Sequence, residues 1–202
     1  MLTAMLQSPH FLYRSEVGTL QAHGQYELTP WEIASELSYN LTGTLPDAVL
    51  LQAASTGALG DEQGILGQAS RLMQTPAGAN KFWEFMESWL GLDQLMLVTR
   101  SAEDYPELTS SIRQAMLGQT KHLVQDVFAG GHLGQLFNNP STYLNEELGE
   151  FYGIAVPGDL ATPDGFTKVS QTSDYHGGIL TEGAFLTTYA KANSSSPIHR
   201  GI

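Results

Sequence analysis

The sequence contains no cysteine. This absence excludes disulfide bonds, a thiolate nucleophile, cysteine-ligated zinc and covalently attached haem in this chain. Basic residues are scarce as well, because 9 lysine and arginine residues stand against 21 aspartate and glutamate residues, for a formal net charge of −12. A surface of that sign repels nucleic acid and anionic lipid and favours solubility and a basic partner. The acidic residues are spread along the chain, so most of them are expected to form a solvated surface.

Long hydrophobic runs are also missing. The longest candidates, such as Ala48 to Ala54, fall far short of the roughly 18 apolar residues that span a bilayer. The first residues, MLTAMLQSPHFLYR, have neither the basic leading region nor the small-residue cleavage site of a signal peptide. A mature secreted chain would lack these features too, so their absence leaves the location open. With 202 residues, of which 42% are hydrophobic, the chain is long enough for one domain, or a domain with an appendage, that buries a core.

The residues that are present predict helices with clear starts. In ELTPWEIASELSYNL, Thr29 is the predicted N-cap, Pro30 the first helical residue and Glu32 the partner of Thr29 in a capping box. A second Thr-Pro start, at Thr75, opens TPAGANKFWEFMESWLG, in which apolar residues recur every three or four positions up to a stop at Gly91.

More helices follow, and the amino-acid composition changes after the longest of them. The longest helix has Pro106 near its start and ends at the Gly130-Gly131 pair. The stretch behind it is rich in Asn, Pro, Gly, Ser and Thr, and one short strand is predicted there over 165–170. The longest helix is thus predicted over 105–131, and further helices are predicted over 61–74, 145–152 and 177–192.

These elements predict a mainly α fold. We expect a helical bundle-like domain of six to eight helices with at most one short β element. The Gly/Pro-rich stretch from about Asn138 to Gly178 has too little helix for a second domain. It is therefore expected to be a long excursion that packs on the helical body.

The aromatic residues of the helix that starts at Thr75 could line a ligand pocket or form a buried face. Their helical spacing is typical of a core, so they are predicted to be buried. These residues are Phe82, Trp83, Phe85 and Trp89.

No catalytic residue is predicted. DYHGGIL, Asp174 to Leu180, has the His-Gly-Gly of esterase oxyanion holes, but the Gly-x-Ser-x-Gly elbow that such enzymes need is absent. None of the six histidines forms a His-x-x-x-His or His-Glu-x-x-His pattern, so no metal site is predicted. The weak candidates for a metal ligand are His122, His176 and His199.

Four segments, taken together, resemble a known family. They are LQSPHFLYRSE (6–16), YELTPWEIASELSYNLTGTLPDAVLL (26–51), YLNEELGEFYGI (143–154) and HGGILTEGAFLTTYAKANSSSPIHRGI (176–202). In this order they resemble the domain-of-unknown-function family numbered 1592 of planctomycete and myxobacterial cytochrome-type exported proteins. Two positions depart from the family's pattern: His176 stands where Arg is more frequent, and Gln119 where Glu is common. The family brings no catalytic residue with it.

The resemblance implies a place in a larger protein. In that family the domain lies between related domains numbered 1595 and 1588, often beside a cytochrome c-like domain. Residues 1–16 are thus expected to end a preceding helical module, 17–193 to form the main helical domain, and 194–202 to be the junction to a following module. No cofactor is expected in this chain, while haem is expected in an associated domain or chain. The implied location is periplasmic or extracellular.

Contacts with a partner are expected near both ends of the sequence. At the junction, SSSPIHRGI, the candidates are Pro197, His199 and Arg200; near the beginning they are Phe11 and Arg14. The favoured hypothesis is a non-catalytic structural or protein-interaction module of a larger exported, redox-associated assembly, whose partners are other chains or domains. The alternative is part of an enzyme, or of a haem or metal protein, whose active site other domains or chains complete.

Overall fold

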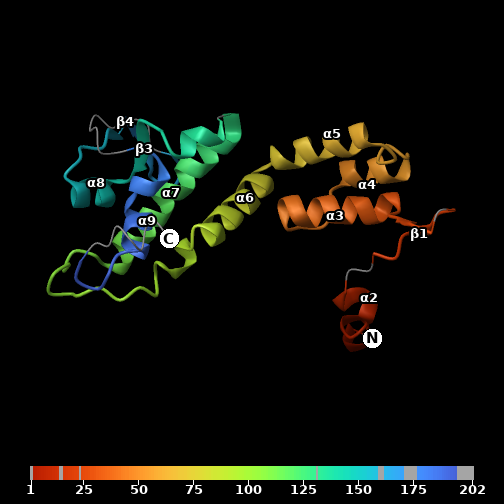
Figure 1. Cartoon of the computed structure of the whole chain (residues 1–202), viewed down its shortest axis with the longest axis horizontal. Helices are drawn as coiled ribbons and strands as arrows, with labels where there is room; N and C mark the ends of the chain where they lie inside the picture. The colour runs from red at the N-terminus through yellow and green to blue at the C-terminus, as the bar shows by residue number, and fades with distance from the viewer. Residues whose placement is uncertain are drawn as a thin grey trace. The chain divides into compact units, whose positions relative to one another are not determined.

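The structure is a computed structural model that describes residues 2–13, 16–22, 24–130, 132–158, 162–170 and 177–194. It divides into two compact units, Met1–Lys81 and Phe82–Ile202 (Figure 1). Each unit has a hydrophobic core of its own. No described helix is both long enough and apolar enough to cross a lipid bilayer.

The core of the first unit lies between three helices. The helix α3 (Pro30–Thr42) packs against α4 (Ala48–Ser55) and α5 (Glu62–Met73). The buried side chains between them are Ala34, Leu50, Ala53, Ala54, Leu59 and Leu72. Before α3 come the short helices α1 (Leu2–Leu6) and α2 (Pro9–Leu12) and the antiparallel pair β1 (Thr19–Leu20) and β2 (Tyr26–Glu27).

The predicted capping box at the start of α3 is confirmed. The Thr29 hydroxyl accepts a hydrogen bond from the Glu32 N–H at 3.3 Å, and the Glu32 carboxylate accepts one from the Thr29 N–H at 2.7 Å. The same carboxylate also accepts hydrogen bonds from the N–H groups of Val17 and Gly18. Hydrogen bonds from the Gly18 and Thr29 backbone lower the pKa of Glu32 to about 2. One side chain therefore both caps α3 and fastens the segment before β1.

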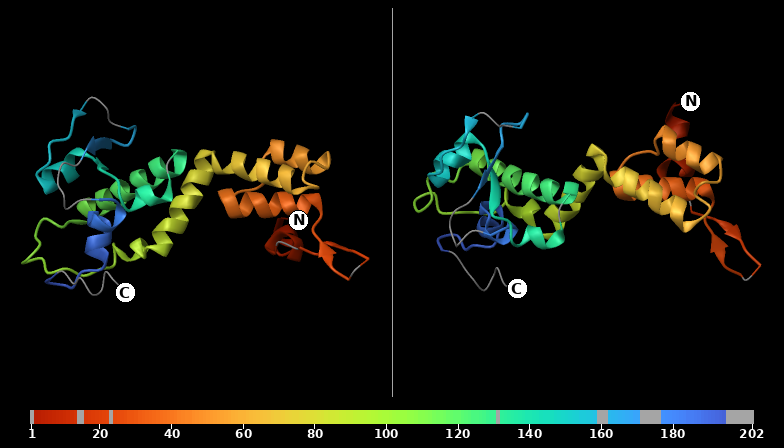
Figure 2. Two further views of the ribbon diagram at one scale, coloured as in Figure 1. Left: turned by 45° about the horizontal axis from the view of Figure 1, so that its top comes forward. Right: turned by 90° about the horizontal axis from the view of Figure 1, so that it is seen from above.

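The second unit is built around the long helix α7 (Ser110–Gly130), which contacts α8, α9, β3 and the short 3-10 helix η2 (Leu133–Leu136), as Figure 2 shows from two sides. The remaining elements are α6 (Pro76–Trp89, in this unit from Phe82 on), η1 (Leu92–Gln94), β3 (Ser141–Leu144), α8 (Glu146–Tyr152), β4 (Thr167–Ser170), η4 (Ile179–Thr181) and α9 (Gly183–Thr188). The strands β3 and β4 pair antiparallel.

One glycine in the middle of α7 has a packing reason. A Cβ atom at Gly118 would lie 2.5 Å from the Phe166 ring, a distance that real side chains do not tolerate. Because Gly118 has no side chain, the segment before β4 can lie directly on the helix. The described part of the Gly/Pro-rich stretch thus packs on the helical body, as expected.

The mainly helical fold class is confirmed, and several details differ from the sequence prediction. The structure has two small two-stranded sheets rather than at most one β element. In one of them β1 pairs with β2, and in the other 141–144 pairs with the predicted strand region. The long helix begins at Ser110, where the Thr109 hydroxyl accepts from the Ile112 N–H, so Pro106 lies in the preceding loop. The predicted helix 177–192 is shorter, formed by η4 and α9.

The aromatic stripe of α6 is only partly buried. Trp83 lies in the core, and Phe82 packs against it and stacks on Phe128. Phe85 and Trp89 are 59% and 62% exposed, so their prediction as core residues was wrong. The buried face of α6 runs instead through Trp83 and Met86, one step around the helix, and continues at Leu90 just after its end.

Candidate functional site: a pocket behind which a glutamate is buried

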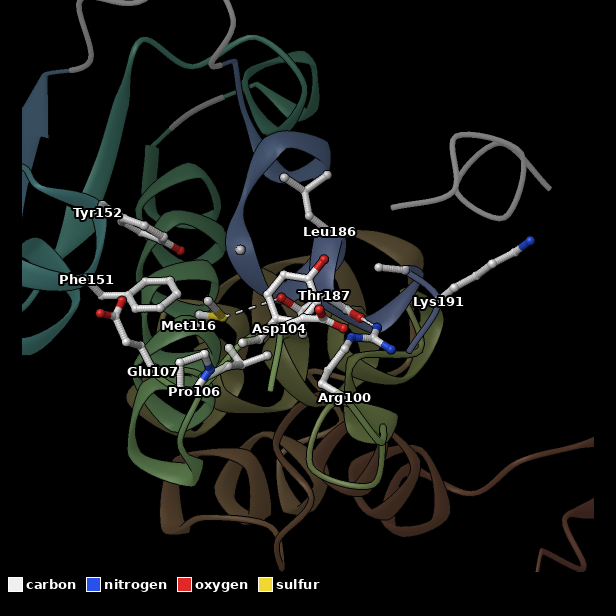
Figure 3. Close-up of a pocket in the computed structure, with 14 residues that line it drawn as sticks. Arg100, Asp104, Pro106, Glu107, Met116, Phe151, Tyr152, Leu186, Thr187 and Lys191 are labelled. Carbon is white, nitrogen blue, oxygen red and sulfur yellow. Dashed lines mark hydrogen bonds between the residues drawn. The ribbon is translucent and has the colours of Figure 1, made fainter. Parts of the chain in front are cut away.

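The second unit contains a pocket of about 580 Å³, which we call the α8–α9 pocket. Its lining comes from the loop between η1 and α7, from Met116 on α7, from the end of α8 and from α9 with the residues that follow it (Figure 3). Phe151 and Tyr152 form one side, and Leu186 and Thr187 form another. Segments far apart in the sequence therefore meet here, and most of the lining is apolar.

A chain of buried polar side chains runs inward from this pocket. The Tyr152 hydroxyl donates to Gln119 Oε1 at 3.1 Å, and the Gln119 amide donates to the Thr142 hydroxyl at 2.8 Å. The Thr142 hydroxyl in turn donates to Glu182 Oε1 at 3.0 Å. Four elements, α8, α7, β3 and the turn before α9, are joined by these three hydrogen bonds. The network therefore links α7, α8 and the start of α9, the helices that line the α8–α9 pocket.

Glu182 is the unusual member of the network. Its side chain is buried, with a relative exposure of 5%, and its Oε2 atom has no hydrogen-bond partner among the described residues. Burial raises the pKa of Glu182 to about 7, against a smaller opposite effect of the Thr120 and Thr142 hydroxyls. Burial, followed by the nearby Glu182 charge, also raises the pKa of Tyr152. A protonated Glu182 therefore suits this environment better than an ionised one.

Gly183 explains how Tyr152 reaches the network. A Cβ atom at this position would clash with the Tyr152 hydroxyl and would crowd the Met116 side chain. The residue after Glu182 must therefore be glycine for α9 and α8 to approach this closely. Gly183 also lines the α8–α9 pocket, so the same close approach shapes its floor.

The charged residues at the rim of the pocket are engaged to different degrees. The Arg100 guanidinium donates to the backbone carbonyls of Thr99 and Thr187, and desolvation, followed by the nearby Arg113, lowers the pKa of Arg100. The carboxylates of Asp104 and Glu107 have no hydrogen-bond or ion-pair partner in the described part of the chain. The Asp104 and Glu107 carboxylates are thus available to a ligand, whereas Arg100 already connects the loop to α9 through its hydrogen bond to Thr187.

His122 is the one predicted metal-ligand candidate that the described residues include. Its Nε2 atom lies 2.9 Å from Asp164 Oδ2, and its ring packs against the rings of Tyr143 and Phe166 at centroid distances of 5.3 and 4.9 Å. Although burial opposes it, hydrogen bonds from Thr162 and His122 lower the pKa of Asp164. In this arrangement His122 is a hydrogen-bonded histidine on the face of α7, and its role as a metal ligand stays a prediction.

Most of the other predicted site residues fall outside the description. His176, His199, Pro197, Arg200 and Arg14 lie outside the described residues. The described residues contain no group of three or more histidine, aspartate or glutamate side chains that could hold a metal ion.

The remaining partner-contact candidate lies at the surface of the first unit. Phe11 on α2 is 65% exposed, and the neighbouring Leu12 is 59% exposed. Nothing in the described chain covers either side chain fully, so the role of Phe11 as a partner contact stays a prediction.

A family model described as "Protein of unknown function (DUF1592)" matches residues 28–154, which is more than half of the chain. The chain belongs to the DUF1592 family. The suspected resemblance is therefore confirmed, and the matched region runs from the capping box of α3 to the turn after α8. No curated protein and no solved structure matches the chain.

The DUF1592 match includes only part of the site. Gln119, Thr142 and Tyr152 lie inside it, whereas Glu182 and α9 follow it. Sequence reasoning missed the network because hydrogen bonds between residues 23 to 40 positions apart leave no local pattern. One signal was present: Glu182 is a single acidic residue inside the apolar run ILTEGAFL, which indicates a buried carboxyl group.

Proposed function

We propose that this DUF1592 chain is a non-catalytic structural or protein-interaction module of a larger exported assembly associated with redox proteins. The observation that carries the proposal is the α8–α9 pocket: its walls are mainly apolar, and carboxylates that have no partner among the described residues lie at its rim. A concave apolar surface with a few polar groups is the usual form of a binding site. The groups buried behind it, Gln119, Thr142 and Glu182, hold secondary-structure elements together and do not line the pocket.

The proposal includes where the module works. It places the chain in the periplasm or outside the cell, with other chains or domains as partners and with any haem in an associated domain or chain. Cell fractionation followed by immunodetection tests the location, and an absorption spectrum of the intact assembly tests for haem. A cytoplasmic location would contradict the exported assignment.

A photo-crosslinking experiment tests the interaction function. Tyr105, which lines the pocket, is replaced by p-benzoylphenylalanine in the native protein, and the matched control carries the same group at Leu133, which is 68% exposed on η2 and does not line the pocket. After irradiation in cells, mass spectrometry should identify one partner segment joined at position 105 and not at position 133. No crosslink at position 105, or substrate turnover by the purified protein, would count against an interaction module.

A further inference from the structure

From the lining and charges of the α8–α9 pocket we infer that its occupant is a polypeptide segment of a partner protein, in which basic side chains flank apolar ones. This inference rests on the proposed interaction function and names the partner class for the same site.

The apolar part of the inference comes from the pocket walls. Tyr105, Pro106 and Leu108 contribute from the loop before α7, Phe151 from α8 and Leu186 from α9. A volume of about 580 Å³ lies within the range of roughly 300–1,000 Å³ that is typical of ligand pockets, and it accepts more than one side chain. Covering these walls removes aromatic and aliphatic surface from water, which favours binding of apolar side chains.

The charge at the rim favours a basic partner. Two acidic and two basic residues line the pocket, but they are not equivalent. Arg100 already donates to two backbone carbonyls, and Figure 3 shows the Lys191 side chain extending away from the cavity. Asp104 and Glu107 have no partner among the described residues, so their carboxylates remain available to cations.

The surroundings of the pocket have the same sign. Glu103 on the loop and Glu146 and Glu150 on α8 are exposed acidic residues on the elements that form the pocket. Together with the net charge of −12, these residues attract a basic segment and speed its association. A second copy of the chain is a poor occupant, since it carries the same excess of acidic residues.

The test uses the full chain and fluorescent peptides of defined composition. The first probe alternates arginine with leucine, the second replaces arginine with glutamate, and the third replaces it with serine. Fluorescence anisotropy should show binding of the arginine peptide, much weaker binding of the serine peptide and none of the glutamate peptide. Binding should weaken as salt is added, because exposed charges are screened.

Two variants locate the binding, and one serves as control. The double variant Asp104→Asn, Glu107→Gln removes both exposed carboxylates and should weaken the arginine peptide about fivefold, since exposed charge pairs are individually weak. Leu186→Ser removes part of the apolar wall and should weaken all binding about tenfold. Glu62→Gln, an exposed residue of α5 in the other unit, should change nothing.

Several results would overturn the inference. Tighter binding of the glutamate peptide would show that Arg100 and Lys191 select an anion. Light scattering that shows self-association, lost in Leu186→Ser, would make a second copy the occupant. A partner crosslinked at position 105 without binding of any peptide would sink the basic–apolar assignment and leave the interaction module standing. The absence of both the crosslink and peptide binding would sink both proposals.

Discussion

Replacing Glu182 with glutamine should change how the stability of the second unit depends on pH. The carboxyl is buried, its Oε2 has no described partner, and its pKa is raised from 4.5 to about 7. The folded state therefore holds a proton that the unfolded chain releases above pH 4.5. The contribution of the protonated Glu182 carboxyl to the free energy of unfolding is fully present below pH 4.5, falls as the pH rises, and is lost above about pH 7.

The magnitude follows from the size of the pKa change. At 1.36 kcal/mol per pKa unit, a rise from 4.5 to about 7 lowers the free energy of unfolding by about 3 kcal/mol between acidic and weakly alkaline solution. In Glu182→Gln the amide resembles the protonated carboxyl and does not ionise. The variant should therefore match the wild type near pH 4.5 and exceed its unfolding free energy by about 3 kcal/mol near pH 8.

Urea denaturation at several pH values measures this difference. Trp83 is buried in the core of the second unit, whereas Trp31 and Trp89 are 53% and 62% exposed, so the tryptophan fluorescence change reports mainly on this unit. Glu150→Gln, on the exposed face of α8, is the matched control and should retain the wild-type pH profile. If the unfolding free energy of Glu182→Gln also follows the wild-type pH profile, ionisation of the buried carboxyl does not destabilise the fold by about 3 kcal/mol.

Four further substitutions should have visible effects in urea or thermal denaturation followed by circular dichroism. Gly183→Ala should destabilise the protein by about 1–3 kcal/mol, because the added methyl clashes with Tyr152; an unchanged midpoint would contradict the close approach. Gly67→Ala, inside α5 with open space around the added methyl, should instead stabilise by about 0.5–1 kcal/mol. Thr29→Ala should cost about 1 kcal/mol through loss of the N-cap. Because the pKa of Glu32 is lowered to about 2, its contribution is present above pH 4.5 and lost as the pH falls through 2; Glu32→Gln should remove that dependence.

Much of the helical framework could be predicted because its signals are local. The bonds between Thr29 and Glu32 join residues three apart, so side-chain identity at those positions is enough to place the start of α3. The start of α6 at Pro76 and its end before Gly91, which has a φ of 63°, follow from the same kind of local stereochemistry. Asn145 likewise caps α8 through the Leu148 N–H, as its position before an acidic turn indicates.

Other predictions failed where neighbours in space decide the outcome. Helical spacing predicted one buried aromatic face on α6, but it could not say which side of the helix meets the core, and Phe85 and Trp89 are exposed. The strand 141–144 has no strong alternating pattern; it forms because 167–170 lies beside it. Gly118 is unfavourable inside a helix by propensity, yet the close contact with the Phe166 ring requires a glycine there.

The sequence by itself determined the family, the mainly helical class, the caps and the acidic charge, because each depends on residue types at fixed short spacings. The tertiary structure alone decided the site. Gln119, Thr142, Tyr152 and Glu182 come from four separate elements, and only folding brings them within hydrogen-bonding distance and removes the carboxyl from water. Burial, and not the identity of Glu182, raises its pKa.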